Sequence, residues 1–431
     1  MEDLTQLALI WAGAFVAVIV ARATRLTPVV YYLGIGALFV NLGWMPEENS
    51  EFIRTLAEVG IILIMFALGF EENPNNFLKS IRKSWGIALF GALAPFTIAF
   101  SVAWFFWGDM NIAIMCGLAM TATAVSLTMV SLKSEGLANS PVATRIMTSA
   151  VLDDIASLAL IAVVIPIVTG DGSTSLIDVE IIVGKAVLFF ILISVVGVVI
   201  FPHEPGHWTK RFPILSRFGA RHALTYAEGE HATLQVLILA LVTGLVGHHF
   251  GFHPAIGAYM AGLILREEYF HSGTSGSFSD TKRIIDNVAF SWIGPVFFVS
   301  LGAHLVFDWE ILVSVIPECL TLIVGILVFQ VTSAALAARY TGGMKPAASI
   351  MIGFGMLGRA ELAFVVIDIA YVEYSLLSTE AFYTLMVTCF FLNIAVPLTI
   401  HWWKPRYEKE RDEENARQRT DGDLPSRIVD S

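Results

Sequence analysis

Thirteen apolar runs, separated by polar connections, dominate this chain. A helix that crosses a bilayer needs about 17–25 largely apolar residues, and most of the runs approach or exceed that length. Residues 232–250 and 254–265 form the least certain pair, because both are short and only a His-rich turn separates them. The runs cover residues 4–21, 28–45, 56–70, 85–107, 110–132, 142–168, 179–201, 232–250, 254–265, 284–307, 311–339, 346–371 and 381–402. They predict an all-α, polytopic membrane protein with 13 transmembrane helices.

Composition supports this prediction and excludes several classes of protein. Hydrophobic residues make up 56% of the chain and charged residues 15%, against about 45–50% and 25% in soluble domains. A secreted enzyme, a nucleic-acid binder and a disordered scaffold are therefore excluded. The net charge of −11 offers no basic surface for a polyanion. We expect no cofactor: the three cysteines are isolated in apolar runs, and no GxxxxGK[ST] sequence indicates an ATP-driven pump.

The basic residues predict how the chain is oriented, because cytoplasmic loops collect Lys and Arg. With the N-terminus outside and the C-terminus in the cytoplasm, 23 of the 26 basic residues lie inside; the others are Arg54, Lys185 and Arg359. The longest inner loop, 202–231, interleaves aromatic and basic residues and predicts an interfacial helix. The tail at 404–431 is dense in charge, and we expect it to be disordered.

An odd number of spans has a topological consequence. Six helices, one linker helix and six more place the second six upside down relative to the first. Two inverted six-helix repeats are thus inferred from topology, and many secondary transporters share this plan.

Two adjacent carboxyl groups, Asp153 and Asp154, lie near the middle of the sixth run. Each ionised carboxylate costs about 2.5–3.5 kcal/mol at that depth. One alternative is a purely structural pair bound to neighbouring helices. The functional interpretation is a site that trades a proton for a cation, because burial favours the neutral form of a carboxyl group and a bound cation favours the charged form.

The fifth run contains small hydroxyl residues, Thr121, Thr123, Ser126 and Thr128, among apolar neighbours. They can simply allow helices to approach closely. They can also belong to a partly unwound stretch whose oxygens line an ion cavity.

A third polar segment lies in the twelfth run, where Gly353, Gly355 and Gly358 precede Arg359. This spacing predicts a broken helix, and a buried guanidinium needs an anion or acceptors. We expect Arg359 to balance Asp153, Asp154 or Glu361. Two interrupted helices at equivalent places in the two halves indicate a binding site at the membrane midplane.

Other polar residues give weaker signals. Glu58, early in the third run, and Asp368, late in the twelfth, can be structural or can line an access path. Three histidines at an outer turn, His248, His249 and His253, can suggest a metal site, but the pattern is interrupted by Gly251.

Seven segments together carry a family resemblance. The chain resembles the second branch of the monovalent cation:proton antiporter superfamily, of the sodium/proton exchanger type, from about Arg25 to about Trp402. The segments are RLTPVVYYLG (25–34), EVGIILIMFALGFE (58–71), TATA (121–124), DD (153–154), GAYMAGL (257–263), PVFFVSLG (295–302) and GRAELAF (358–364).

The resemblance implies a transmembrane antiporter domain (1–403) followed by a cytoplasmic tail (404–431). A core part (about 85–168 and 311–402), containing two crossed discontinuous helices, would move against a dimerisation part (about 1–70 and 232–307), with a linker helix at about 179–201. It assigns ion binding to Asp154, with Asp153 as a variable neighbour and Thr123 as the hydroxyl of the unwound helix. Arg359 and Glu361 match an Arg-Gly-Glu element in which Ala360 replaces Gly. Gln330 stands where relatives with an Asp pair often have Lys, so the sequence does not predict the charge stoichiometry.

The prediction is a transporter and not an enzyme: an antiporter that exchanges Na⁺, or Li⁺ or K⁺, for H⁺ by alternating access. Its site would comprise Asp154, Asp153, Thr123 and Thr121, with Gln330 and Glu58 in support. We expect a homodimer in a bacterial inner membrane. The alternatives are a K⁺/H⁺ efflux antiporter, a cation channel and a sodium-coupled symporter.

Overall fold

A computed structural model describes most of the chain. Outside the described residues are 1, 25, 47–48, 72–73, 138–139, 251, 266, 271–276, 360 and 423–431, together with most of 170–229. The predicted seventh span (179–201) and the interfacial helix at 202–231 lie largely in that last part. Within the described residues the protein is helical and has no strand.

Among the described residues, eight helices are long and apolar enough to cross a membrane, which confirms the prediction of a multi-pass membrane protein. The number thirteen stays a prediction. The eight are α1 (Glu2–Thr24), α3 (Glu51–Glu71), α4 (Pro74–Trp107), α7 (Pro141–Thr169), α11 (Ala232–His249), the run α13–η3–α14 (Phe278–Asn287, Val288–Trp292 and Gly294–Gly302), α16 (Ile316–Tyr340) and α19 (Thr379–Gly422). Shorter apolar helices are α2 (Pro28–Asn41), α5 (Met110–Ala119), α12 (Pro254–Ile264) and α17 (Pro346–Gly355). The other elements are α6 (Val125–Ser134), η2 (Glu267–Tyr269), α15 (Trp309–Ser314), α18 (Glu361–Asp368) and η4 (Ile369–Glu373).

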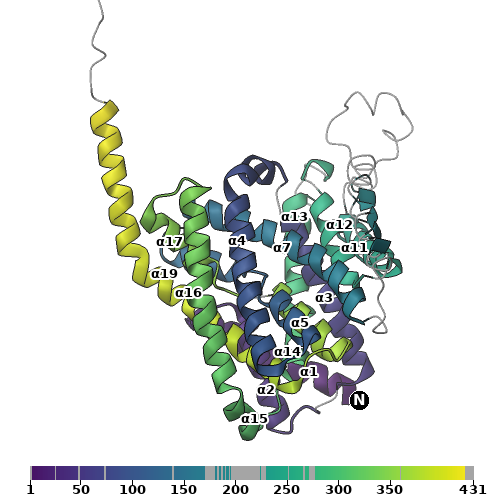
Figure 1. Cartoon of the computed structure of the whole chain (residues 1–431). Helices are drawn as coiled ribbons and strands as arrows, with labels where there is room; N and C mark the ends of the chain where they lie inside the picture. Colours follow the sequence, from purple (N-terminus) through teal and green to yellow (C-terminus); the bar gives the residue numbers. More distant parts are fainter. Residues whose placement is uncertain are drawn as a thin grey trace, which may run out of the picture.

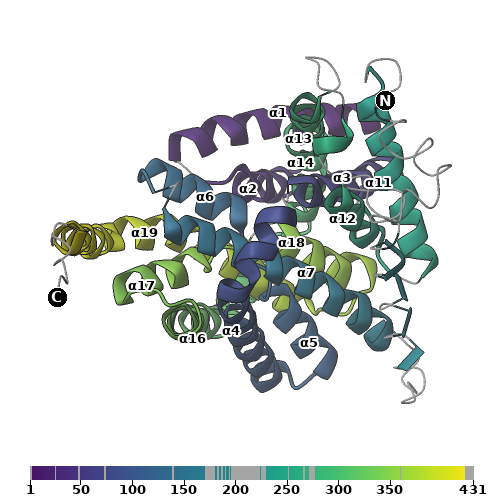
Figure 2. The same ribbon diagram turned by 90° about the horizontal axis from the view of Figure 1, so that it is seen from above.

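The helices pack as two groups (Figures 1 and 2). One group contains α1, α2, α3, α11, α12 and α14, and the other contains α4, α5, α7, α16, α17 and α19. The short helix α18 lies between them, in contact with α5 of one group and α3 of the other. An edge-to-face pair of Phe364 and Phe298, with ring centroids 6.3 Å apart, joins α18 to α14.

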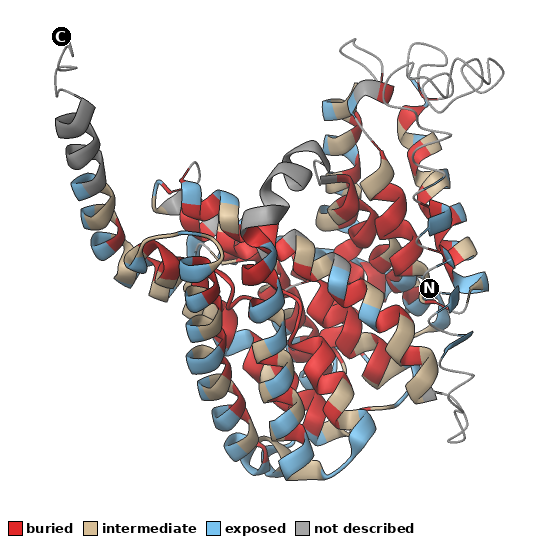
Figure 3. Cartoon of the chain, turned by 45° about the horizontal axis from the view of Figure 1, so that its top comes forward, coloured by how far each residue is buried: buried red, intermediate tan, exposed pale blue. Residues whose placement is uncertain are grey.

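Burial follows the pattern expected of a helical bundle in lipid. Buried residues line the interior of the bundle, while the outward faces of α1, α4, α11 and α16 are exposed (Figure 3). Those outward faces are apolar, with Phe15, Phe105 and Leu245 each more than 60% exposed. Such surfaces are suited to contact with acyl chains and not with water.

Glycines bring the backbones of the first group into contact. A Cβ on Gly36 of α2 would lie 2.0 Å from the carbonyl oxygen of Val299 in α14, and one on Gly262 of α12 would lie 2.3 Å from that of Phe66 in α3. Small residues at such crossings permit the close van der Waals packing that holds membrane helices together. This group is therefore tightly joined from backbone to backbone.

The prediction of a disordered tail is wrong for its first part, because α19 continues to Gly422 (Figure 1). Glu410 of this extension accepts hydrogen bonds from the backbone N–H groups of Ala347 and Ala348, both at 3.1 Å, at the N-terminus of α17. These are donors that a helix start otherwise leaves unsatisfied.

A second contact anchors the same extension near the end of α6. Lys404 donates to Glu135 at 3.1 Å, and the ring of His401 lies 2.9 Å from the same carboxylate. Burial acts to raise the pKa of Glu135, but the hydrogen bonds and charges of His401 and Lys404 outweigh it and lower that pKa. The tail is thus ordered by capping and ion pairing with the bundle, which composition does not reveal.

Candidate functional site

The predicted fifth span is interrupted at its hydroxyl-rich segment. The helix stops at Ala119, resumes at Val125, and leaves the segment between them buried. Thr123 Oγ1 donates to Asp153 Oδ2 of α7 at 3.3 Å. Thr121 Oγ1 instead donates to the carbonyl oxygen of Gly117, in its own helix, at 2.9 Å. Of these two predicted site residues, only Thr123 hydrogen-bonds to the Asp pair.

The predicted twelfth span is interrupted as well, and the two interruptions meet. α17 ends at Gly355 and α18 begins at Glu361. The backbone N–H of Ala124 donates to the carbonyl oxygen of Gly358 at 2.8 Å, and Thr128 Oγ1 donates to that of Gly355 at 2.7 Å. Irregular backbone is tolerated at membrane depth only where other groups satisfy its polar atoms. Here each break supplies partners for the other.

Arg359 is fully buried in this crossing. Its guanidinium donates to the carbonyl oxygens of Met356, Leu357 and Gly358 at 2.9–3.2 Å, and to Gln330 Oε1 of α16 at 2.7 Å. The hydrogen bonds that hold the cation thus come from peptide dipoles and an amide. Asp153 lies close enough for the two charges to interact. Arg359 therefore balances the Asp153 carboxylate through charge alone, while its hydrogen bonds go to uncharged oxygens.

Gln330, which was predicted only to support the ion site, links several helices in the structure. It is fully buried, and its Nε2 donates to the carbonyl oxygens of Met356 at 2.7 Å and Gly91 at 3.3 Å. Through these bonds it joins α16 to α4 and to the end of α17 while it also holds Arg359. A lysine could donate here but could not accept from Arg359, because an ammonium has no acceptor.

The two aspartates differ in their surroundings. Asp153 is buried, 1% exposed, whereas Asp154 is partly exposed. Adjacent residues point about 100° apart on a helix, which places the two carboxylates in different environments. Within the Asp153 carboxylate, Oδ2 accepts a hydrogen bond, whereas Oδ1 has no such partner among the described residues. The pair thus offers two carboxylates as possible ligands: that of Asp153 is enclosed, and that of Asp154 is more accessible.

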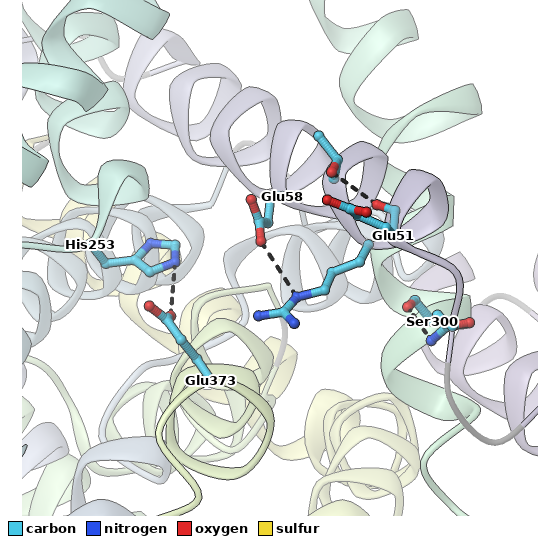
Figure 4. A network of polar contacts seen from close by, with 8 residues as sticks. Glu51, Glu58, His253, Ser300 and Glu373 are labelled. Carbon is cyan, nitrogen blue, oxygen red and sulfur yellow. Dashed lines mark hydrogen bonds and ion pairs between the residues drawn. The ribbon is translucent and has the colours of Figure 1, made fainter.

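Two further predicted residues line cavities that the Asp pair does not line. Glu361 is the first residue of α18, where the helix dipole favours an anion, and it lines a cavity of about 720 Å³ together with Lys282 and Arg283. Glu58 is exposed, lies 3.7 Å from Arg54 in an ion pair (Figure 4), and together with Asp368 lines a second cavity of about 650 Å³. Neither cavity is lined by Asp153 or Asp154.

The histidine-rich turn has a capping role in the structure. His253 precedes α12, and its Nδ1 accepts a hydrogen bond from the N–H of Ala255 at 3.2 Å. Within the described parts of the chain, no group of three or more His, Cys, Asp or Glu residues could hold a metal ion.

One site residue was missed by the sequence analysis. Asn393 of α19 is fully buried, and its Oδ1 accepts the backbone N–H of Arg359 at 2.7 Å. Its signal was present, since an amide in the middle of the last apolar run is as costly as any unpaired polar group in lipid. The same reasoning that found the Asp pair would have found it.

Close contact at the crossing predicts the effect of one added methyl group. A Cβ at position 358 would lie 2.9 Å from the Cβ of Ala124. We expect Gly358→Ala to force the breaks apart and to lower the free energy of unfolding by about 1–3 kcal/mol, as overpacking does. The measurement is the Tm of the purified protein. Gly34→Ala is the matched control, because nothing lies within 4 Å of its added Cβ. Equal Tm values for the two variants would contradict the proposed crossing.

Comparisons with known proteins agree with this geometry. The family described as "Sodium/hydrogen exchanger, transmembrane" matches residues 11–404. The chain is 27% identical to a probable Na⁺/H⁺ antiporter, GerT, of Bacillus cereus, over 74% of this chain and 77% of the relative. It is 27% identical to the Na⁺/H⁺-K⁺ antiporter GerN of the same organism (75% and 76% covered), and 23% identical to a Na⁺/H⁺ antiporter of Enterococcus hirae (94% and 98% covered).

A solved structure shares the fold. The sodium proton antiporter MjNhaP1 from Methanocaldococcus jannaschii, at pH 8, superimposes with a TM-score of 0.65 at 16% identity, covering 93% of this chain and 99% of that one. Since the family match spans nearly all of the sequence, the chain belongs to the sodium/hydrogen exchanger family of monovalent cation:proton antiporters.

Proposed function

We propose that this protein exchanges Na⁺, or Li⁺ or K⁺ in its place, for H⁺ across a membrane by alternating access. The observation that carries the proposal is the meeting of two broken helices beside an intramembrane Asp pair. Hydroxyl, carbonyl and carboxylate oxygens gather there, and these are the ligands that hard cations prefer. Relatives named as antiporters of Na⁺ and H⁺ support the same assignment.

In the proposed cycle Asp154 is the exchanging group, because it is the more accessible carboxylate. On one side of the membrane it takes up a proton, and on the other it releases that proton and accepts a cation. Asp153, held by Thr123, shares the charge or relays the proton. Arg359, held in position by its cradle of oxygens, offsets the buried negative charge when both carboxylates are ionised. Coupling follows because a proton and a cation compete for the same oxygens.

The wider architecture is part of the proposal. We infer that the group containing α4, α7 and α16 is the moving core and that the group containing α1, α3 and α12 is a dimerisation part. Thirteen spans, two inverted repeats, a homodimer and a bacterial inner membrane location, with the N-terminus outside, complete this assignment. A role in pH homeostasis would follow from the exchange.

Exchange of K⁺ is the second candidate. It is favoured by the name of the Na⁺/H⁺-K⁺ relative and by 25% identity to a glutathione-regulated potassium-efflux protein of Cronobacter sakazakii, over 84% of this chain and 54% of that one. A cation channel and a sodium-coupled symporter are the remaining alternatives.

The test uses purified protein in proteoliposomes with an internal pH dye and an imposed pH gradient. We expect Na⁺ or Li⁺ to dissipate the gradient, and choline to have no effect. A comparison of transport rates with the membrane voltage clamped and with it free to change reports the net charge moved per cycle. A gradient unaffected by Na⁺, Li⁺ and K⁺ would refute the proposal. Current without proton movement would instead indicate a channel, and a requirement for an organic solute would indicate a symporter.

A further inference from the structure

The apolar part of α19 ends in a pair of tryptophans, and a basic segment follows it. Trp402 is 60% exposed, and Tyr340, which ends α16 shortly before α17 begins, is 81% exposed. Exposed indole and phenol rings at the ends of apolar helices mark the boundary between acyl chains and headgroups, because each ring is apolar in one part and polar in another. Arg406 lies one helical turn beyond Trp402. Its guanidinium is therefore placed at the level of the lipid headgroups.

Two aromatic rings hold this guanidinium in position. Its Cζ lies 4.9 Å from the ring centroid of Trp402 and 4.6 Å from that of Trp403, within the range of cation–π interactions. We call Trp402, Trp403 and Arg406 the aromatic platform. It is fixed to α17, because Trp403 Nε1 donates to the carbonyl oxygen of Ala347 at 2.9 Å and Phe354 packs edge-to-face against both indoles. Figure 1 shows α19 beside α17 before it continues beyond the bundle.

The carboxylate that could pair with Arg406 is bonded elsewhere. Glu410 lies four residues on, the spacing at which opposite charges meet on a helix, but both of its oxygens accept from backbone N–H groups at the start of α17. The Arg406 side chain is exposed, and within the part of the chain that the structure describes no hydrogen bond or ion pair reaches its guanidinium. Lys404, by contrast, is bound to Glu135 at 3.1 Å. The five N–H donors of Arg406 are thus available to a ligand from outside the chain.

An exposed apolar face of α19 leads to this guanidinium. Phe391, Leu398 and Trp402 are 51%, 64% and 60% exposed. Their spacing of seven and then four residues places them on one side of the helix, and Arg406 continues the same row after four more. A molecule that lies along this face therefore has apolar contacts over most of its length and a positive charge at one end. A phospholipid has the matching form.

The charge at this position selects among phospholipids. A planar guanidinium binds phosphate oxygens through two parallel hydrogen bonds. Because Arg406 already lies over both indole rings, a choline or ammonium group brought to those rings would meet a like charge. Lys409, which is exposed and three residues further on, adds a second positive charge on the same side of the helix. The position therefore favours headgroups with a net negative charge over zwitterionic ones.

We propose that the aromatic platform is a binding site for an anionic phospholipid, such as phosphatidylglycerol, in the leaflet at this end of the bundle. The guanidinium of Arg406 donates to the phosphate oxygens, and an acyl chain lies along Leu398 and Phe391. Because the platform rests on Ala347 and Phe354 of α17, a bound lipid holds the extension of α19 against the bundle. This inference does not depend on the proposed exchange.

The experiment measures the Tm of delipidated protein in detergent micelles that contain equal concentrations of phosphatidylglycerol or phosphatidylcholine. For the wild type, we expect phosphatidylglycerol to raise the Tm by at least about 2 °C more than phosphatidylcholine, because a ligand that binds the folded state stabilises it. Arg406→Gln removes the charge and the forked donors, and it should lose at least half of this difference. Each difference is taken within one variant, so a lower Tm of the variant itself does not affect the comparison.

The matched control is Arg411→Gln. Arg411 also lies over an aromatic ring, 6.0 Å from the centroid of Tyr407, but it is paired with Asp412 at 3.7 Å. This control should keep the wild-type difference, and an equal loss in it would reduce the effect to general attraction between a basic segment and anionic micelles and overturn the site. Equal Tm values of the wild type in the two lipids, or an undiminished difference in Arg406→Gln, would also overturn it. Inorganic phosphate should leave the Tm unchanged; if it reproduced the effect of phosphatidylglycerol, the ligand would be a free anion and the assignment to a lipid would be wrong.

Discussion

Asp154→Asn is expected to abolish cation-dependent proton movement in proteoliposomes, with a loss of at least about 100-fold, or roughly 2.7 kcal/mol. Asparagine has nearly the same shape and keeps one oxygen, so packing around α7 is preserved. It can neither bind a proton nor carry the negative charge that balances a cation. The variant therefore loses both competing ligands at once, and the measurement is the initial rate of pH-gradient dissipation on addition of Na⁺.

A chemically identical substitution on the extension of α19 provides the control. Asp412 is 71% exposed and belongs to the part of α19 beyond the bundle, so Asp412→Asn should transport at the wild-type rate. Wild-type exchange by Asp154→Asn would show that the Asp pair is not the exchange site. Retention of a normal Tm in that variant separates lost chemistry from lost folding.

Arg359→Ala is expected to lower the free energy of unfolding by about 3–5 kcal/mol, the cost of breaking a buried, paired charge. The substitution leaves Gln330 Oε1 and three carbonyl oxygens without their donor and opens space at the crossing of the breaks. A fall in Tm and in the yield of monodisperse protein would report the loss. Arg339→Ala is the control, because Arg339 is exposed and, within the described residues, makes a single hydrogen bond, to the carbonyl oxygen of Met344.

A double variant distinguishes lost hydrogen bonding from lost volume. Arg359→Met restores most of the side-chain volume, and Gln330→Leu removes the acceptor that Arg359→Met leaves unpaired. We expect the double variant to be less destabilised than the sum of the two single variants, because both residues belong to one network. Strict additivity would show that Gln330 does not hold Arg359.

The break before Arg359 was predicted from a local cause, because Gly353, Gly355 and Gly358 precede it and weaken the helix. The break at Thr123 was one of two alternatives that the hydroxyl-rich segment left open. The pairing of the breaks was not predictable in the same way. The hydrogen bond from Ala124 to Gly358 joins residues more than 200 positions apart, and no local pattern encodes a contact at that separation.

The surroundings of Arg359 illustrate the same limit. That a buried guanidinium needs acceptors follows from its five donors, but a carboxylate and a cradle of carbonyl oxygens satisfy this requirement equally well. Which one is used depends on how α16 and α19 bring Gln330 and Asn393 to the break. The tail was wrongly predicted to be disordered for a related reason. Glu410 stabilises the extension of α19 through contacts with another helix, which the tail's own composition does not reveal.

By itself, the sequence determined that this chain is a polytopic membrane protein, that a helix breaks before Arg359, and which charges lie at membrane depth. Those conclusions rest on the cost of placing polar groups in lipid, which each residue incurs whatever its neighbours are. Only the tertiary structure decided which oxygens hold Arg359, that Thr123 and not Thr121 hydrogen-bonds to the Asp pair, and that Glu361 and Asp368 line separate cavities. These depend on directed contacts between helices distant in sequence, and the identity of a single residue does not specify its partner.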